Sequence, residues 1–264
     1  MDGIFISHTD NINDDTILTV IEFDSLNDEL RSLLDENLVS ICEGEFSTSS
    51  LDNVKRRVIE LFTNKEAKED GAYSNWEMGA VAEFFIHLYI KSIGLKQECM
   101  FFNLEDRSAK KGFDGYYTDE ELHWIMESKS GSIDTKDISH GTKLKEALTD
   151  LQGKFSGTAK SKNNPWREAF NHASHMDVKT AEDIRTYMKT LAEDFTAGVF
   201  HTSEEFNVIP CATLYFEDTD FSPKEDIIRQ AGEATSEISY KKAHLVCVSS
   251  KSVGIFKEYI GFPE

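Results

Sequence analysis

The chain has 264 residues, of which 39% are hydrophobic and 11% aromatic, and this composition excludes a disordered or fibrous protein. No apolar run reaches the roughly eighteen residues of a membrane span, and the first residues lack the basic and apolar segments of a signal peptide. The net charge of −20 argues against a uniformly basic nucleic-acid-binding surface. We therefore expect one cytoplasmic domain over residues 1–264, with no membrane contact.

The N-terminal part of the chain shows strand and helix patterns. Residues 17–23 are rich in β-branched side chains and predict a strand. Residues 25–37 carry leucines at helical spacing and predict a helix capped by Ser25. Further helices are expected over residues 51–62 and 74–94, and the second is apolar enough to be buried.

The central part mixes three strand patterns with two helix patterns. Residues 97–102, 112–117 and 122–128 predict strands, and the short turn between the last two predicts a hairpin. Apolar side chains at helical spacing predict helices over residues 138–155 and 184–195.

The C-terminal part alternates strand and helix. Residues 206–217 and 243–250 predict strands, residues 222–236 predict a helix between them, and a short helix is expected after them. Residues 157–165 form a polar segment that predicts a loop. The fold class is therefore α/β, with a mixed central sheet flanked by helices.

Charge is distributed unevenly. Residues 1–50 hold twelve acids and one base, Arg31, so this region is either a docking surface for a basic partner or a face that keeps the protein soluble. One stretch is basic and has no acid, and we assign it the contact with a nucleic-acid backbone: Lys154, Lys160, Lys162 and Arg167.

Some other side chains have a simpler interpretation than catalysis. The four cysteines show no CxxC pair, so we expect free buried thiols: Cys42, Cys99, Cys211 and Cys247. His172 and His175 are interpreted as a surface pair rather than as zinc ligands. Asp218 and Asp220 fit a turn before a helix capped by Ser222.

The strand at residues 122–128 continues into an acid and an amine. Because side chains alternate along a strand, Glu127 and Lys129 point to the same side. Asp114, flanked by two glycines in the preceding strand, would lie beside Glu127 across the hairpin. Two such carboxylates repel unless a cation lies between them, and magnesium prefers oxygen ligands of this kind. Lys129 could then hold an attacking water or stabilise negative charge on phosphorus.

A further acid lies within the apolar helix. Glu83 is the one charged residue among residues 80–90, and burying a carboxylate is costly unless it is paired or binds a cation. It is either a metal ligand or an acid paired with a basic side chain. His87, one turn later, is interpreted as a core histidine.

This set of residues resembles the active site of the PD-(D/E)xK nuclease superfamily. There the helix acid, the aspartate and the E-x-K strand bind magnesium and cut phosphodiester bonds. The resemblance implies Mg²⁺ as cofactor, with Mn²⁺ as an alternative, and Glu83, Asp114 and Glu127 as metal ligands that act with Lys129. Phe113 stands where the superfamily usually has proline, which leaves the ligand in place.

The flanking sequences narrow the resemblance. Four stretches are similar to HamA, the nuclease subunit of the Hachiman anti-phage defence system: GAYSNWEMGAVAEFFIHLYI, KKGFDGYY, WIMESKSG and IPCATLYFE. The similarity is strongest over residues 71–131. It implies an effector that degrades DNA together with a superfamily 2 helicase partner. No GxxxxGK[ST] loop occurs in the chain, so ATP-driven translocation would come from another chain.

An alternative of a different class remains open. The nuclease core could survive as a catalytically silent interaction module that binds and regulates a helicase. The presence of all four residues, Glu83, Asp114, Glu127 and Lys129, favours the enzyme, because a degenerate nuclease is expected to have lost at least one of them.

Overall fold

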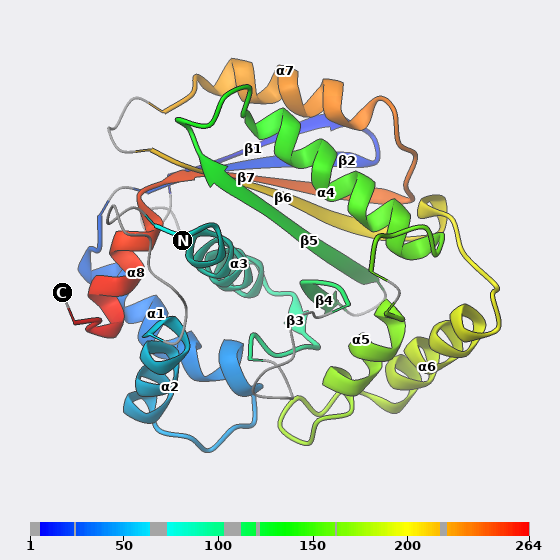
Figure 1. Ribbon diagram of the computed structural model, residues 1–264, viewed down its shortest axis with the longest axis horizontal. Coiled ribbons are helices and arrows are strands. Elements are labelled where there is room, and N and C mark those ends of the chain that lie inside the picture. The colour runs from blue at the N-terminus through cyan, green and yellow to red at the C-terminus, as the bar shows by residue number, and fades with distance from the viewer. Residues whose placement is uncertain are drawn as a thin grey trace.

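The computed structural model describes residues 6–23, 25–63, 73–102, 112–119, 122–161, 163–216 and 221–263. In these residues one seven-stranded sheet forms the centre of the molecule, in the order β1-β2-β7-β6-β5-β4-β3 (Figure 1). Its strands are β1 (Ile6–Asn13), β2 (Thr16–Phe23), β3 (Lys96–Gln97), β4 (Gly115–Thr118), β5 (His123–Ser132), β6 (Asn207–Tyr215) and β7 (Lys242–Ser250).

The sheet has a parallel centre and antiparallel edges. β2, β7, β6 and β5 pair in parallel. β1 adds to β2 in antiparallel fashion, and the β4–β5 hairpin and β3 form the other edge. The parallel strands β6 and β7 are buried along nearly their whole length, as expected for strands covered on both faces.

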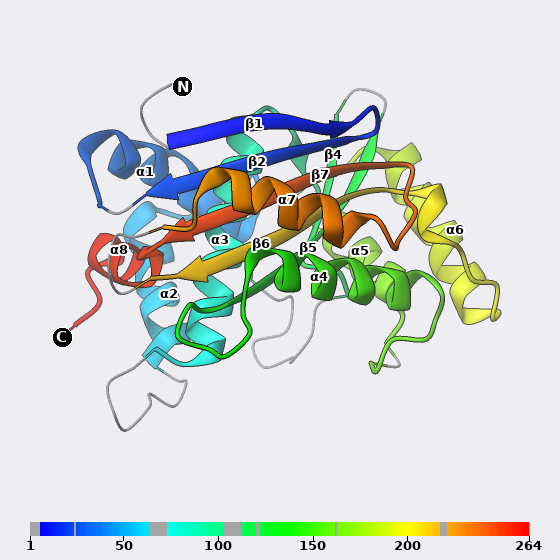
Figure 2. The same ribbon diagram turned by 90° about the horizontal axis from the view of Figure 1, so that it is seen from above.

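Helices cover both faces of the sheet. One layer packs into the larger hydrophobic cluster and contains α1 (Asp28–Glu43), α2 (Leu51–Thr63), α3 (Asn75–Ser92) and α8 (Ser252–Ile260). The second cluster contains side chains of α4 (His140–Phe155), α5 (Pro165–Ala173), α6 (Glu182–Thr196) and α7 (Lys224–Thr235). Figure 2 shows α4 and α7 lying along the strands of the sheet. Each fully buried Leu, Val or Phe in these clusters contributes roughly 1.5–3 kcal/mol to folding.

Most of the long sequence patterns are confirmed. The strands expected at residues 17–23, 206–217 and 243–250 correspond to β2, β6 and β7. The apolar helix is α3, which begins with a capping box between Ser74 and Glu77. The α/β class predicted from the sequence is therefore correct.

Two local predictions at the start of the chain and in its centre are wrong. The cap of α1 is Asn27 rather than Ser25, because the Asn27 side chain accepts the Leu30 N–H at 2.7 Å. The strand expected over residues 97–102 ends at Gln97. Instead, the amides of Phe101 and Phe102 donate to carbonyls at the end of α1, which draws this segment away from the sheet.

Other elements were not predicted or differ in detail. The sequence patterns did not predict β1 or α5. Helix α5 is capped by Asn164 and begins at Pro165, the last residue of the predicted loop. α7 begins after Pro223 without a side-chain cap, so Ser222 does not serve as one. Asp218 and Asp220 lie outside the described residues.

The acidic N-terminal region is part of the central fold. β1 and β2 belong to the sheet, and α1 buries Leu30, Leu34 and Leu38 completely. Deleting residues 1–50 would therefore remove core elements along with any docking surface. Three of its acids on α1 are exposed: Asp28, Glu29 and Glu36.

The expectation for the cysteines is confirmed, since all four are free and buried. The surface interpretation of His172 is wrong. Its ring is 5% exposed, and Nδ1 accepts the Met100 N–H at 3.3 Å. Among the helices of the described ranges, none has the length and apolar character required to cross a membrane.

Candidate active site

The middle of β5 places an acid and an amine side by side, as the alternation of strand side chains predicts. The strand does not end at residue 128 as expected but continues to Ser132. Lys129 Nζ donates to Glu127 Oε1 at 2.7 Å. The preceding residues Ile125 and Met126 pack into opposite clusters, so Glu127 lies on the face covered by α4. Glu127 is 2% exposed, which makes it a carboxylate held inside the protein rather than on its surface.

Asp114 immediately precedes β4 instead of lying within it. Gly115 pairs with Met126, so Asp114 stands next to the Glu127–Ser128 segment of β5. Its Oδ2 accepts the Ser128 N–H at 2.8 Å. The hairpin therefore brings this aspartate to the E-x-K segment, as the sequence predicts.

Both glycines that flank Asp114 are needed for close packing. A Cβ on Gly112 would lie 2.4 Å from the carbonyl oxygen of Pro165, and a Cβ on Gly115 would lie 2.7 Å from the Tyr117 ring. The first of these contacts is with backbone, which cannot move aside. The approach of α5 and of β5 to this turn thus depends on glycine.

Helix α4 contributes two charged side chains from its C-terminal half. Lys154 Nζ lies 2.5 Å from Glu127 Oε2 and 3.5 Å from Asp150 Oδ2. Asp150 Oδ2 also accepts from Lys129 Nζ at 2.7 Å. Two lysines and two carboxylates thus form one connected network.

The sequence interpretation missed Asp150 and placed Lys154 with the basic loop. The structure places Lys154 in the last turn of α4, where its side chain is 14% exposed. The available signal was the spacing of these residues. An acid and a base one turn apart, on a helix that follows the E-x-K strand, can both face that strand.

Glu83 approaches from the opposite face of the sheet. It lies on α3, whose buried side chains share a cluster with Met126. Its Oε1 lies 3.4 Å from His87 Nε2, and His87 Nδ1 hydrogen-bonds the Tyr117 hydroxyl. The interpretation of His87 as a core histidine is confirmed, and Glu83 is an acid in contact with that histidine.

Burial and neighbouring charges shift the pKa values of these carboxylates. Burial, reinforced by Asp114, raises the pKa of Glu127 to about 8, although Lys154 and Lys129 oppose this shift. Burial and then Glu83 raise the pKa of Asp114. Burial would raise the pKa of Asp150, but its hydrogen bond with Glu127 and the two lysines hold that pKa well below its ordinary value.

The lysines remain cationic in this environment. Burial acts to lower the pKa of Lys129, but the carboxylates of Glu127 and Asp150 raise it above its ordinary value. The pKa of Lys154 is raised in the same way, against burial, by Glu127, Asp114 and Asp150. Each ammonium group therefore serves as a fixed positive charge.

The donor set fits a hard divalent cation with few protein ligands. The described ranges contain no group of three or more His, Cys, Asp or Glu side chains arranged to hold a metal ion. Magnesium does not require one, because it binds through one or two carboxylates and fills its other positions with water or substrate oxygens. Asp114 and Glu127 supply two carboxylates, and a cation would relieve the repulsion that contributes to the raised pKa of Glu127.

The remaining basic residues lie in different settings. Lys160 is exposed, and Arg167 is half-buried in the first turn of α5. Lys162 lies outside the described residues. Because Lys154 contacts Glu127, fewer basic side chains can contact a nucleic-acid backbone than the sequence suggests.

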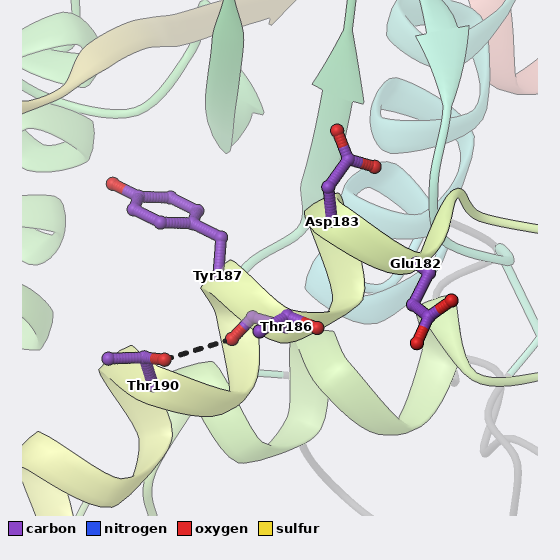
Figure 3. Close-up of a pocket in the computed structure, with 5 residues that line it drawn as sticks. All are labelled: Glu182, Asp183, Thr186, Tyr187 and Thr190. Atoms are coloured by element: carbon purple, nitrogen blue, oxygen red, sulfur yellow. Dashed lines mark hydrogen bonds between the residues drawn. The ribbon is translucent and has the colours of Figure 1, made fainter.

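A separate shallow hollow of about 690 Å³ runs along α6 and is lined by Glu182, Asp183, Thr186, Tyr187 and Thr190. Figure 3 shows all five side chains on this one helix, with Asp183 and Tyr187 on the same side of it. No residue of the site at β5 lines it. Its two acids and lack of a basic lining residue make it unsuitable for phosphate.

The mixed seven-stranded sheet flanked by helices is consistent with a nuclease-like α/β fold. The chain belongs to the HamA family, whose family model matches residues 3–261. This membership links the protein to the Hachiman anti-phage defence system. No curated protein matches the chain.

Proposed function

We propose that the protein is a metal-dependent deoxyribonuclease that acts as an effector of anti-phage defence. The observation that carries the proposal is the meeting of Asp114, Glu127 and Lys129 in the middle of β5. Two carboxylates beside an ammonium group can bind a cation and a phosphodiester together. Membership of the HamA family supports the biological setting.

Asp114 and Glu127 would hold Mg²⁺ or Mn²⁺, and Glu83 would act as an auxiliary acid next to Asp114. When bound, the cation would polarise the phosphodiester and lower the pKa of water. Lys129 keeps its proton, since its pKa is raised, so its task is to stabilise negative charge on the phosphoryl oxygens. This assigns Lys129 the role of a cation rather than that of a general base.

A superfamily 2 helicase is the proposed partner. The chain has no phosphate-binding GxxxxGK[ST] loop of its own, so the proposal assigns strand separation to a second protein. The exposed acids of α1 offer a predominantly negative surface to that partner.

The second candidate is a catalytically silent module that binds the helicase. One observation favours it: both oxygens of Glu127 are engaged by lysines within the protein. A site kept in that arrangement would be a structural ion-pair network.

Cleavage of linear and circular DNA by the purified chain, with magnesium or with a chelator, separates the two candidates. The nuclease proposal expects cutting that requires the metal and falls by about a hundredfold or more in Glu127→Ala and Lys129→Ala. Lys136→Ala is the control, because this lysine is 92% exposed and pairs with Asp137 outside the network. If nothing cuts, even with the helicase and ATP added, the silent module is the better explanation.

A further inference from the structure

Glu127 already has a cationic partner on each of its two oxygens. Oε1 accepts from Lys129 and Oε2 accepts from Lys154, at 2.7 and 2.5 Å. A divalent cation that binds this carboxylate must share an oxygen with an ammonium group or displace it. Sharing is unfavourable, because two cations within a few ångströms of each other repel strongly where the side chains are shielded from water.

The two lysines differ in how firmly they are held. Lys129 makes two short contacts, 2.7 Å to Glu127 and 2.7 Å to Asp150. Lys154 makes one short contact, to Glu127, and lies 3.5 Å from Asp150. Displacing Lys154 therefore breaks one close contact, whereas displacing Lys129 breaks two.

Asp150 offers Lys154 a second position. The two residues lie four apart on α4, so they occupy the same side of the helix. The Lys154 ammonium group already lies 3.5 Å from Asp150 Oδ2, so a shift of this side chain toward Asp150 would close the contact. That shift would free Glu127 Oε2 while keeping Lys154 paired.

We propose that Lys154 competes with the divalent cation for Glu127, and that Asp150 accepts Lys154 when the cation binds. The inference rests on the proposed metal-binding role of Asp114 and Glu127. Competition by Lys154 then sets the metal concentration at which the divalent cation occupies the site. Asp150 is a positioning residue that lowers this concentration.

Thermal unfolding of the full chain over a range of Mg²⁺ and Mn²⁺ concentrations measures loading without an activity assay, because a cation that binds the folded state raises the melting temperature. Lys154→Met should lower the half-maximal metal concentration by about tenfold, since a competing charge is removed. Asp150→Asn should raise it. Lys145→Met is the matched control, because this lysine lies on the same helix and pairs with exposed Glu237 at the surface.

A double variant tests whether Asp150 acts through Lys154. If it does, adding Asp150→Asn to Lys154→Met should change the metal concentration much less than Asp150→Asn does alone. An equal shift in both backgrounds would contradict the role of acceptor. Lys154→Gln provides a second variant if Lys154→Met lowers the melting temperature without metal.

The outcomes separate this inference from the proposed function. If metal stabilises the wild type but not Glu127→Gln, and Lys154→Met leaves the half-maximal concentration unchanged, the metal site stands and the competition is refuted. If metal does not stabilise the wild type and Lys154→Met gains no metal response, both the site and the competition are refuted.

Discussion

Asp114 Oδ2 and the Ser128 amide are joined by a hydrogen bond of 2.8 Å, which fixes a side chain that precedes β4 to the backbone of β5. The ladder between these strands ends at Gly115 and Met126, so the carboxylate extends the pairing by one further contact. One group thus has two tasks, because the same carboxylate is proposed to bind the metal.

Asp114→Asn should separate these two tasks. The asparagine side-chain oxygen can still accept the Ser128 N–H, so the free energy of unfolding should fall by no more than about 1 kcal/mol. Cleavage should be lost, since the charge that holds the cation is removed. Denaturant unfolding and DNA cleavage on the same preparation check this. A large loss of stability in Asp114→Asn would contradict the assigned hydrogen bond.

The raised pKa of Glu127 predicts a pH-dependent stability. Burial and Asp114 raise this pKa from 4.5 to about 8, so the folded state holds the proton more tightly than the unfolded state. The resulting stabilisation is present below the unfolded pKa and is lost as pH rises through the folded pKa. Between about pH 4.5 and pH 8, the wild type should lose free energy of unfolding relative to Glu127→Gln.

Urea unfolding of both proteins across that range measures the difference. Saturating magnesium should reduce the loss in the wild type, because a cation favours the ionised carboxylate. A difference between the two proteins that stays constant with pH would show that Glu127 does not titrate in this window.

The basic residues outside the network should affect binding rather than chemistry. Lys160→Glu combined with Arg167→Glu should weaken DNA binding similarly for all sequences and reduce its dependence on salt, because fewer counterions are released. Binding isotherms at several salt concentrations provide the test, with Lys136→Glu as a control on an exposed lysine outside the basic stretch. An unchanged salt slope would remove these residues from the proposed contact.

The acidic surface of α1 can be tested without removing core elements. Reversing Asp28, Glu29 and Glu36 to lysine should weaken binding to the helicase partner, because all three are exposed. Since Asp28 and Glu29 also favour the helix dipole in the first turn of α1, the melting temperature should fall only as far as in a control with the same change. An equal charge change on α6, at Glu182, Asp183 and Glu193, is the matched control. Equal loss of binding in both variants would indicate a general charge effect rather than a docking surface.

Gly112 should be intolerant of a side chain. Gly112→Ala places a Cβ against the Pro165 backbone, so the free energy of unfolding should fall by about 1–3 kcal/mol. Gly232→Ala in α7 is the control, since a Cβ there meets nothing within 4 Å and alanine favours a helix. Equal stabilities of the two variants would show that the turn before β4 can relax.

The parts of the fold that the sequence predicted are those governed by local periodicity. The apolar run of α3 and the parallel strands β6 and β7 each bury nearly every residue, so hydrophobicity alone marks them. The shared direction of Glu127 and Lys129 follows from strand alternation in the same way. These features need no knowledge of distant contacts.

The parts that were missed depend on contacts between distant segments. The strand predicted over residues 97–102 stops near Glu98. The carboxylate of Glu98 is fully buried and accepts hydrogen bonds from Thr118 and Thr180. Asp150 becomes a site residue only because α4 packs against β5, where Asp150 accepts a hydrogen bond from Lys129 Nζ. The spacing of Asp150 and Lys154 is a local signal, but no local pattern reveals the distant partners Thr118, Thr180 and Lys129.

The pairing of β2 with β7 has a consequence for the order in which the protein can form during synthesis. Thr16 lies opposite Ala243, so the sheet joins segments from the two ends of the chain. Contacts of such long separation form slowly, and domains are commonly built from the N-terminus as the ribosome releases it. A nascent chain would contain β4, β5 and α4, which are consecutive, well before β7 emerges to complete the sheet. We therefore expect the strand hairpin that bears the site to be held firmly in place only after β7 has been synthesised.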